Sequence, residues 1–123
     1  MANVEAIKQA VKALRETTME QSFGGMGGAF WNAIEATDPF DQEFCSACAL
    51  GVIAVDAINK GVLSFDKMEE QNYMPILEDY LGVRRDYLWR IVNWNDQEHL
   101  SFNRIADKIE EDYLTPDFLK PVT

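Results

Sequence analysis

The sequence predicts an all-α protein of six or seven helices packed around one buried central helix, residues 39–60. Apolar residues recur at spacings of three and four through most of the chain, and no segment alternates convincingly between apolar and polar residues. Residues 44–55 carry no charge and are apolar on most sides, which is typical of a helix surrounded by other helices. The length of 123 residues suits a single helical domain, residues 1–123.

The first predicted helix covers residues 3–21. Its apolar face is formed by residues that step by three and four positions, Val4, Ile7, Val11 and Leu14. Glycine is costly inside a helix, so the glycine-rich stretch 24–28 predicts the end of this one. A short helix, residues 29–36, is expected next.

The central helix is expected to begin at Asp38-Pro39. The Asp38 side chain can accept a hydrogen bond from a backbone N–H of the first turn. Proline suits the first helical position because the N–H that it lacks would have no partner within the helix. Gly61 is well placed to end this helix.

The later part of the chain is divided among four predicted helices, residues 64–71, 75–81, 84–93 and 101–113. Gly82 ends the second of these, and Ser101 is a good N-cap for the last. We interpret Trp94-Asn95-Asp96 as a structural turn between the last two. Trp94 can bury its indole, Asn95 tolerates a left-handed backbone, and Asp96 can accept hydrogen bonds from backbone N–H groups in the turn.

The charge balance argues against a protein that binds nucleic acid directly. Acidic residues outnumber basic ones by 21 to 11, which gives a formal net charge of −10. Binding to nucleic-acid phosphates depends on lysine and arginine. No apolar run approaches the roughly 20 residues that a membrane span needs, and the N-terminus does not resemble a signal peptide. We therefore expect a soluble, cytoplasmic protein.

The two cysteines, Cys45 and Cys48, are expected to be buried and unbridged inside the central helix. A redox pair would need an exposed cysteine at a helix N-terminus after a strand, and a zinc site would need a second pair of ligands. We therefore expect no metal and no cofactor. One catalytic alternative remains open, in which Cys48 is the nucleophile of a hydrolase, His99 its base and Asp96 the group that orients the base.

Two sets of residues are candidates for binding another protein. The first set surrounds the glycine-rich bend and is apolar: Phe23, Met26, Phe30 and Trp31. The second set is acidic and lies near the C-terminus: Asp107, Glu110, Glu111 and Asp112. Aromatic and methionine side chains suit an adaptable contact surface, and carboxylates suit a partner with a basic surface. A DNA-mimicking inhibitor, whose carboxylates replace phosphates, is a further alternative.

Several short motifs together resemble a group of small, uncharacterised helical proteins from phages and bacteria. The motifs are Cys48-Ala49-Leu50-Gly51, Trp94-Asn95-Asp96 and the amphipathic stretch that follows Ser101. The resemblance covers roughly residues 45–113, and members often have acidic residues where this chain has Asn103-Arg104. It implies a helical fold and a phage or bacterial setting, and it brings no established activity. We therefore expect a phage-encoded modulator or inhibitor of a host protein, which acts by binding and not as an enzyme.

Overall fold

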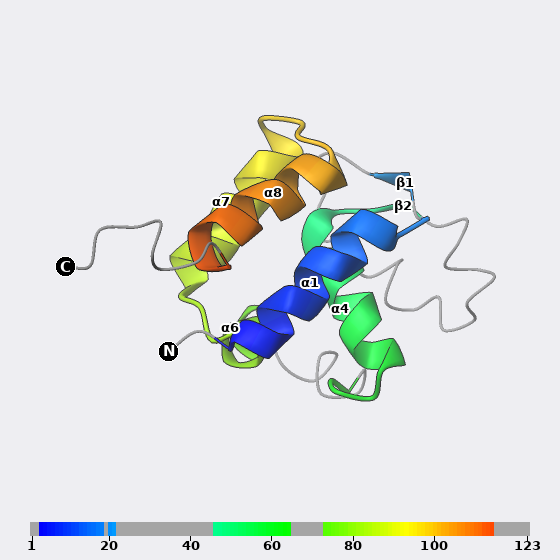
Figure 1. Ribbon diagram of the computed structural model, residues 1–123, viewed down its shortest axis with the longest axis vertical. Helices are drawn as coiled ribbons and strands as arrows, with labels where there is room; N and C mark the ends of the chain where they lie inside the picture. The colour runs from blue at the N-terminus through cyan, green and yellow to red at the C-terminus, as the bar shows by residue number, and fades with distance from the viewer. Residues whose placement is uncertain (1–2, 19, 22–45, 65–72, 115–123) are drawn as a thin grey trace.

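The computed structural model describes residues 3–18, 20–21, 46–64 and 73–114, and this part of the chain contains five helices and one short pair of parallel strands (Figure 1). In chain order the elements are α1 (Val4–Glu16), β1 (Glu20–Gln21), β2 (Ser46–Ala47), α4 (Ala49–Asn59), α6 (Tyr73–Leu81), α7 (Arg85–Asp96) and α8 (Phe102–Tyr113). The predicted helical class is confirmed, because each strand has only two residues. The predicted number of six or seven helices is not confirmed by the described residues.

The five helices share one apolar core. Helix α1 lies between α8 and α4 and packs against both, while α4 also packs against α7 (Figure 1). The largest side chains with almost no exposed surface come from α1, α4, α6, α7 and α8, and they are Ile7, Leu14, Leu50, Ile53, Leu77, Leu88, Ile91, Ile105 and Val52. Eight of the eleven residues of α4 are buried, so the predicted burial of this helix is confirmed for 49–59.

The predicted start of the central helix is wrong over the residues that the structure describes. Ser46–Ala47 is extended and pairs in parallel with Glu20–Gln21, so its backbone cannot be helical. Helix α4 begins at Ala49, with Cys48 as its N-cap in an extended conformation. Residues 38–45, which hold the proposed proline start and Cys45, lie outside the described residues. The predicted end is confirmed by Gly61, whose φ of 74° suits glycine.

The predicted first helix is too long. Asn3 caps α1 through its side chain, which accepts a hydrogen bond from the Ala6 N–H, and the helix ends at Glu16. Thr17 is already extended, and the chain then enters β1. Strand pairing with β2 gives the backbone of Glu20–Gln21 hydrogen-bond partners other than those of a helix.

The predicted turn at Trp94-Asn95-Asp96 is also wrong, because all three residues belong to α7. The left-handed residue of this connection is His99, with a φ of 54°.

Helix α8 agrees closely with its prediction, because the Ser101 hydroxyl accepts a hydrogen bond from the Arg104 N–H and caps the helix. The predicted end of α6 at Gly82 is confirmed as well, because Gly82 has a positive φ of 67°.

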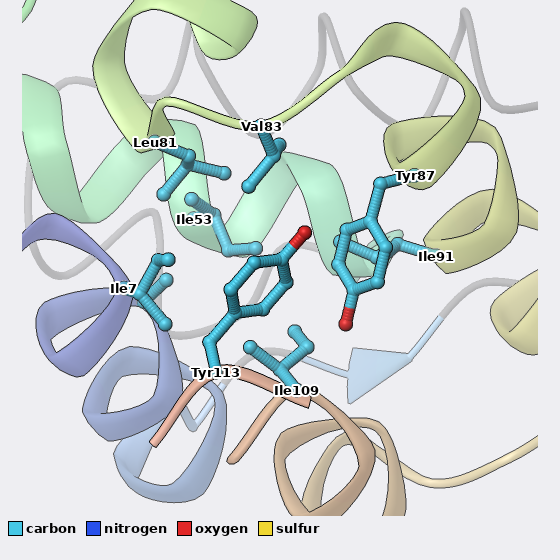
Figure 2. A pocket seen from close by; sticks show the side chains of 9 residues that line it. Ile7, Ile53, Leu81, Val83, Tyr87, Ile91, Ile109 and Tyr113 are labelled. Atoms are coloured by element: carbon cyan, nitrogen blue, oxygen red, sulfur yellow. The ribbon is translucent and has the colours of Figure 1, made fainter. Parts of the chain in front are cut away.

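A small apolar gap lies where α1, α4, α7 and α8 meet (Figure 2). Its volume is about 10 Å³, which is about the space for one water molecule. It is lined by Ile7, Ala10, Ile53, Leu81, Val83, Tyr87, Ile91, Ile109 and Tyr113. The two tyrosine rings meet edge to face, with 5.0 Å between their centroids. The gap is therefore a feature of core packing and is too small for a substrate.

Within the described residues, no helix is both long enough and apolar enough to cross a membrane.

Candidate functional site

The most connected polar group in the described core is the side chain of Asn95 on α7, which is only 1% exposed. Its Oδ1 accepts a hydrogen bond from the backbone N–H of Ala49 (3.2 Å) and another from Nε2 of Gln21 (2.9 Å). Its Nδ2 donates to Oδ1 of Asp96 (2.8 Å). The Asp96 carboxylate can only accept, so this bond orients the amide with its oxygen toward the two donors.

Gln21 extends this network to the connection between α7 and α8. Its Nε2 also donates to the backbone carbonyl of Leu100 at 2.6 Å. Strand β1 and the N-terminus of α4 therefore meet at one amide, Asn95 at the end of α7, and Gln21 joins this amide to the α7–α8 connection. We call the side chains of Gln21, Asn95 and Asp96 the amide cluster. Buried polar groups rarely remain without hydrogen bonds, and the Asn95 amide provides the acceptor for donors from two separate parts of the chain, Gln21 and Ala49.

Cys48 lies beside this network, at the N-cap of α4. Its side chain is buried, with 2% of the residue exposed, and Sγ accepts a hydrogen bond from the Gly51 N–H at 3.4 Å. Burial raises the pKa of the Cys48 thiol to about 11, and the negative charge of Asp96 adds to this shift, while the Gly51 hydrogen bond opposes it. At neutral pH the sulfur is therefore a protonated thiol. Because a nucleophile needs the thiolate, this environment is unfavourable for cysteine catalysis.

Of the three residues of the hydrolase alternative, Cys48, Asp96 and His99, the structure brings only the first two close together. Asp96 is close enough to Cys48 for its charge to raise the pKa of the thiol. His99 is exposed in the α7–α8 connection, whereas the Cys48 sulfur lies in the core.

Tyr73 on α6 is a neighbour of Cys48 and Asp96 that the sequence did not indicate. Burial raises the pKa of its hydroxyl, and the charges of Cys48 and Asp96 contribute to the increase.

Slow thiol labelling is expected for Cys48. In a Cys45→Ser variant, which leaves Cys48 as the single cysteine, a neutral-pH disulfide reagent should react at least about a hundredfold more slowly with the native protein than with the urea-unfolded chain. Raising the pH from 9 to 11 should also lower the free energy of unfolding of this variant more than that of a protein with Cys48→Ala. The thiol loses its proton at a lower pH in the unfolded chain than in the native protein, so rising pH favours the unfolded chain. Labelling of the native protein as fast as that of the unfolded chain would contradict the burial of Cys48.

The acidic set on α8 has partners within the fold. Arg15 on α1 forms ion pairs with Asp107 at 2.8 Å and with Glu110 at 3.6 Å. The hydrogen bond from Arg15 lowers the pKa of Asp107, and Arg104 adds to the effect. Asp112 accepts a hydrogen bond from the Tyr87 hydroxyl at 2.7 Å. These carboxylates therefore join α8 to α1 and α7, a role that the sequence pattern did not indicate.

One large aromatic side chain stands out on the surface of the described residues. Trp89 on α7 is 50% exposed, and the other exposed large apolar side chains there are Val4 and Val62. The spacing of Tyr87, Leu88 and Ile91 in the sequence is typical of one inner face of α7, and Trp89 does not lie on that face. This spacing is the sequence signal for an exposed Trp89.

The apolar candidates Phe23, Met26, Phe30 and Trp31 lie outside the described residues, so their role in binding stays a prediction. Among the described residues there is no group of three or more His, Cys, Asp or Glu side chains that could hold a metal ion. Comparisons of the chain with protein-family models, curated proteins and solved structures gave no match. The resemblance to phage and bacterial proteins therefore rests on the sequence motifs alone.

Proposed function

We propose that this protein acts by binding another protein, with Trp89 on the outer face of α7 as the central contact. The observation that carries the proposal is the half-exposed indole of Trp89 on a well-formed helix. Tryptophan is among the residues that contribute most to protein–protein binding, because it buries a large rigid surface at little cost in conformational entropy. A tryptophan already held on a helix offers this surface in a fixed position.

The excess of carboxylates over basic groups in the chain, a net charge of −10, favours a basic partner. The Asp86 side chain, three residues before Trp89 on α7, is strongly exposed and pairs with Arg84 at 3.5 Å. The arginines of α7 have contacts within the fold, because Arg85 pairs with Glu78 and Arg90 lies 5.8 Å from the ring centroid of Tyr87. Lysine or arginine from a partner could pair with the carboxylates and stack on the indole face.

The proposed biological setting follows from the sequence resemblance. It favours a phage-encoded modulator or inhibitor that acts on a host protein in the bacterial cytoplasm. The hydrolase alternative is less well supported, because Cys48 is buried and its raised pKa keeps the thiol protonated. The DNA-mimic alternative is also less well supported, because Asp107, Glu110 and Asp112 have partners within the fold and do not act as a free row of charges.

Replacing Trp89 by alanine should weaken partner capture without unfolding the protein. Tagged wild type, Trp89→Ala and Val62→Ala are used to capture proteins from a bacterial lysate. Val62 is the matched control, because it is an exposed apolar residue on the connection after α4. A partner retained by wild type and Val62→Ala should bind Trp89→Ala at least about tenfold more weakly. Its capture should also weaken as salt is raised.

Equal capture of the same partner by Trp89→Ala and Val62→Ala would contradict the proposed surface. Capture that does not change with salt would contradict the proposed basic character of the partner. Thermal unfolding of both variants provides the folding control.

A further inference from the structure

The Asn95 amide contacts the chain on both sides of residues 22–45. Gln21 immediately precedes this segment, and its Nε2 donates to Asn95 Oδ1. Ala49 follows it after strand β2, and the backbone N–H of Ala49 donates to the same oxygen. The strand pair joins the same two places, with Glu20 opposite Ser46 and Gln21 opposite Ala47. One buried oxygen atom therefore connects two parts of the chain that are far apart in sequence.

The strand pair is too short to hold these two places together by itself. Each strand has two residues, and even a full two-stranded hairpin is marginal in water without further packing. The bonds to Asn95, in contrast, join the strand pair to α7, and the bond from Ala49 is buried while that from Gln21 is partly buried. Without the amide, the Ala49 N–H would lose its buried acceptor, and the Gln21 Nε2 would lose the Asn95 oxygen and keep its bond to Leu100.

We infer that Asn95 is a clamp that keeps β1, β2 and the first turn of α4 closed as one unit, and that release of this clamp exposes the Cys48 sulfur. Cys48 lies between β2 and Ala49, so it moves with the backbone whose N–H the clamp holds. Because Gln21 and Ala49 donate to the same Oδ1 atom, loss of the Asn95 amide weakens the attachment of β1 and that of the α4 N-terminus together. This inference is independent of the protein-binding proposal and concerns local opening of the fold.

The opening is local because another set of contacts holds the rest of the described fold. Helix α1 packs extensively against α8, where the buried residues include Leu14 and Ile105. Arg15 adds ion pairs from α1 to the acidic residues of α8. None of these contacts uses Asn95. Proteins open in cooperative parts whose stabilities differ, and the clamp defines one such part here.

The test compares Asn95→Ala and Gln21→Ala with Asn93→Ala in the Cys45→Ser background. Asn93 is the matched control, because it is an exposed asparagine of α7 whose Nδ2 donates to Glu98. Two rates are measured: labelling of Cys48 by a disulfide reagent at neutral pH, and hydrogen exchange at each backbone amide. In Asn95→Ala, Cys48 labelling and exchange at Ala49 should each be faster by roughly tenfold or more. Protection of the α8 amides should change much less.

Gln21→Ala keeps the inference testable if Asn95→Ala does not fold. Gln21→Ala should accelerate Cys48 labelling and exchange at Ala49 by a smaller factor than Asn95→Ala. In the double variant it should increase these two rates little beyond those of Asn95→Ala, because both substitutions act through the same oxygen. Asn93→Ala should leave both rates within about twofold of the parent. The inference is overturned if Gln21→Ala leaves both rates unchanged. A uniform loss of protection across α1, α4 and α8 in a folded Asn95→Ala protein would also overturn it, since this would show a general loss of stability.

Discussion

Replacing Trp94 by alanine is expected to lower the free energy of unfolding by about 3–5 kcal/mol, whereas replacing Trp89 should lower it by less than about 1 kcal/mol. The two residues lie on the same helix but differ in environment. Trp94 is 8% exposed and meets the Tyr87 ring edge to face, with 6.0 Å between the centroids. The Lys108 ammonium lies 5.5 Å from the Trp94 ring centroid. Trp89 has few such contacts to lose, because it is half exposed.

Urea unfolding followed by far-ultraviolet circular dichroism measures both free energies without relying on tryptophan fluorescence. The comparison is internal, because both variants remove the same side chain from α7. A Trp94→Ala protein as stable as Trp89→Ala would contradict the assignment of Trp94 to the core. If such a protein had also lost partner capture, Trp94 would belong to the binding surface, and the proposed function would have to be revised accordingly.

Replacing Ile53 by alanine is expected to cost about 2–5 kcal/mol of unfolding free energy. Ile53 is on the buried helix α4, is almost fully buried and borders the apolar gap between α1, α4, α7 and α8 (Figure 2). Removing its outer carbons would enlarge a space that the surrounding side chains already leave unfilled. Ile53→Val, which removes a single methylene group, should cost only about 0.5–1.5 kcal/mol.

The same urea measurement on Val62→Ala provides the control, because Val62 is exposed. Its stability should stay within about 0.5 kcal/mol of wild type. A graded loss through Ile53→Val to Ile53→Ala would confirm that α4 is the centre of the core. Equal stability of Ile53→Ala and Val62→Ala would contradict that position.

The amide cluster shows which part of the candidate site could be predicted. The sequence pointed to Trp94-Asn95-Asp96 and to Cys48, and it correctly predicted a buried Trp94. It assigned Asn95 to a turn, because asparagine is common in left-handed conformations. In the structure His99 has that conformation, and Asn95 is helical and buried. The partners of its amide are 46 and 74 positions away, and short motifs contain no information about contacts over that separation.

The sequence by itself determined the helices whose signals are local. Helix α8 has a serine cap and a regular apolar stripe, and Gly61 and Gly82 end α4 and α6 at positions that need a positive φ. These features involve residues only a few positions apart. Their energies are therefore nearly the same in a short peptide as in the folded chain.

Only the tertiary structure decided where α1 ends, where α4 begins and what Asn95 does. Residues 46 and 47 suit a helix by composition, yet they are extended because Glu20–Gln21 lies beside them. The Asn95 side-chain oxygen accepts a hydrogen bond from the Ala49 N–H in the first turn of α4, so the start of that helix depends on α7. Helix propensities amount to tenths of a kcal/mol per residue, and a few buried hydrogen bonds between distant parts of the chain are enough to override them.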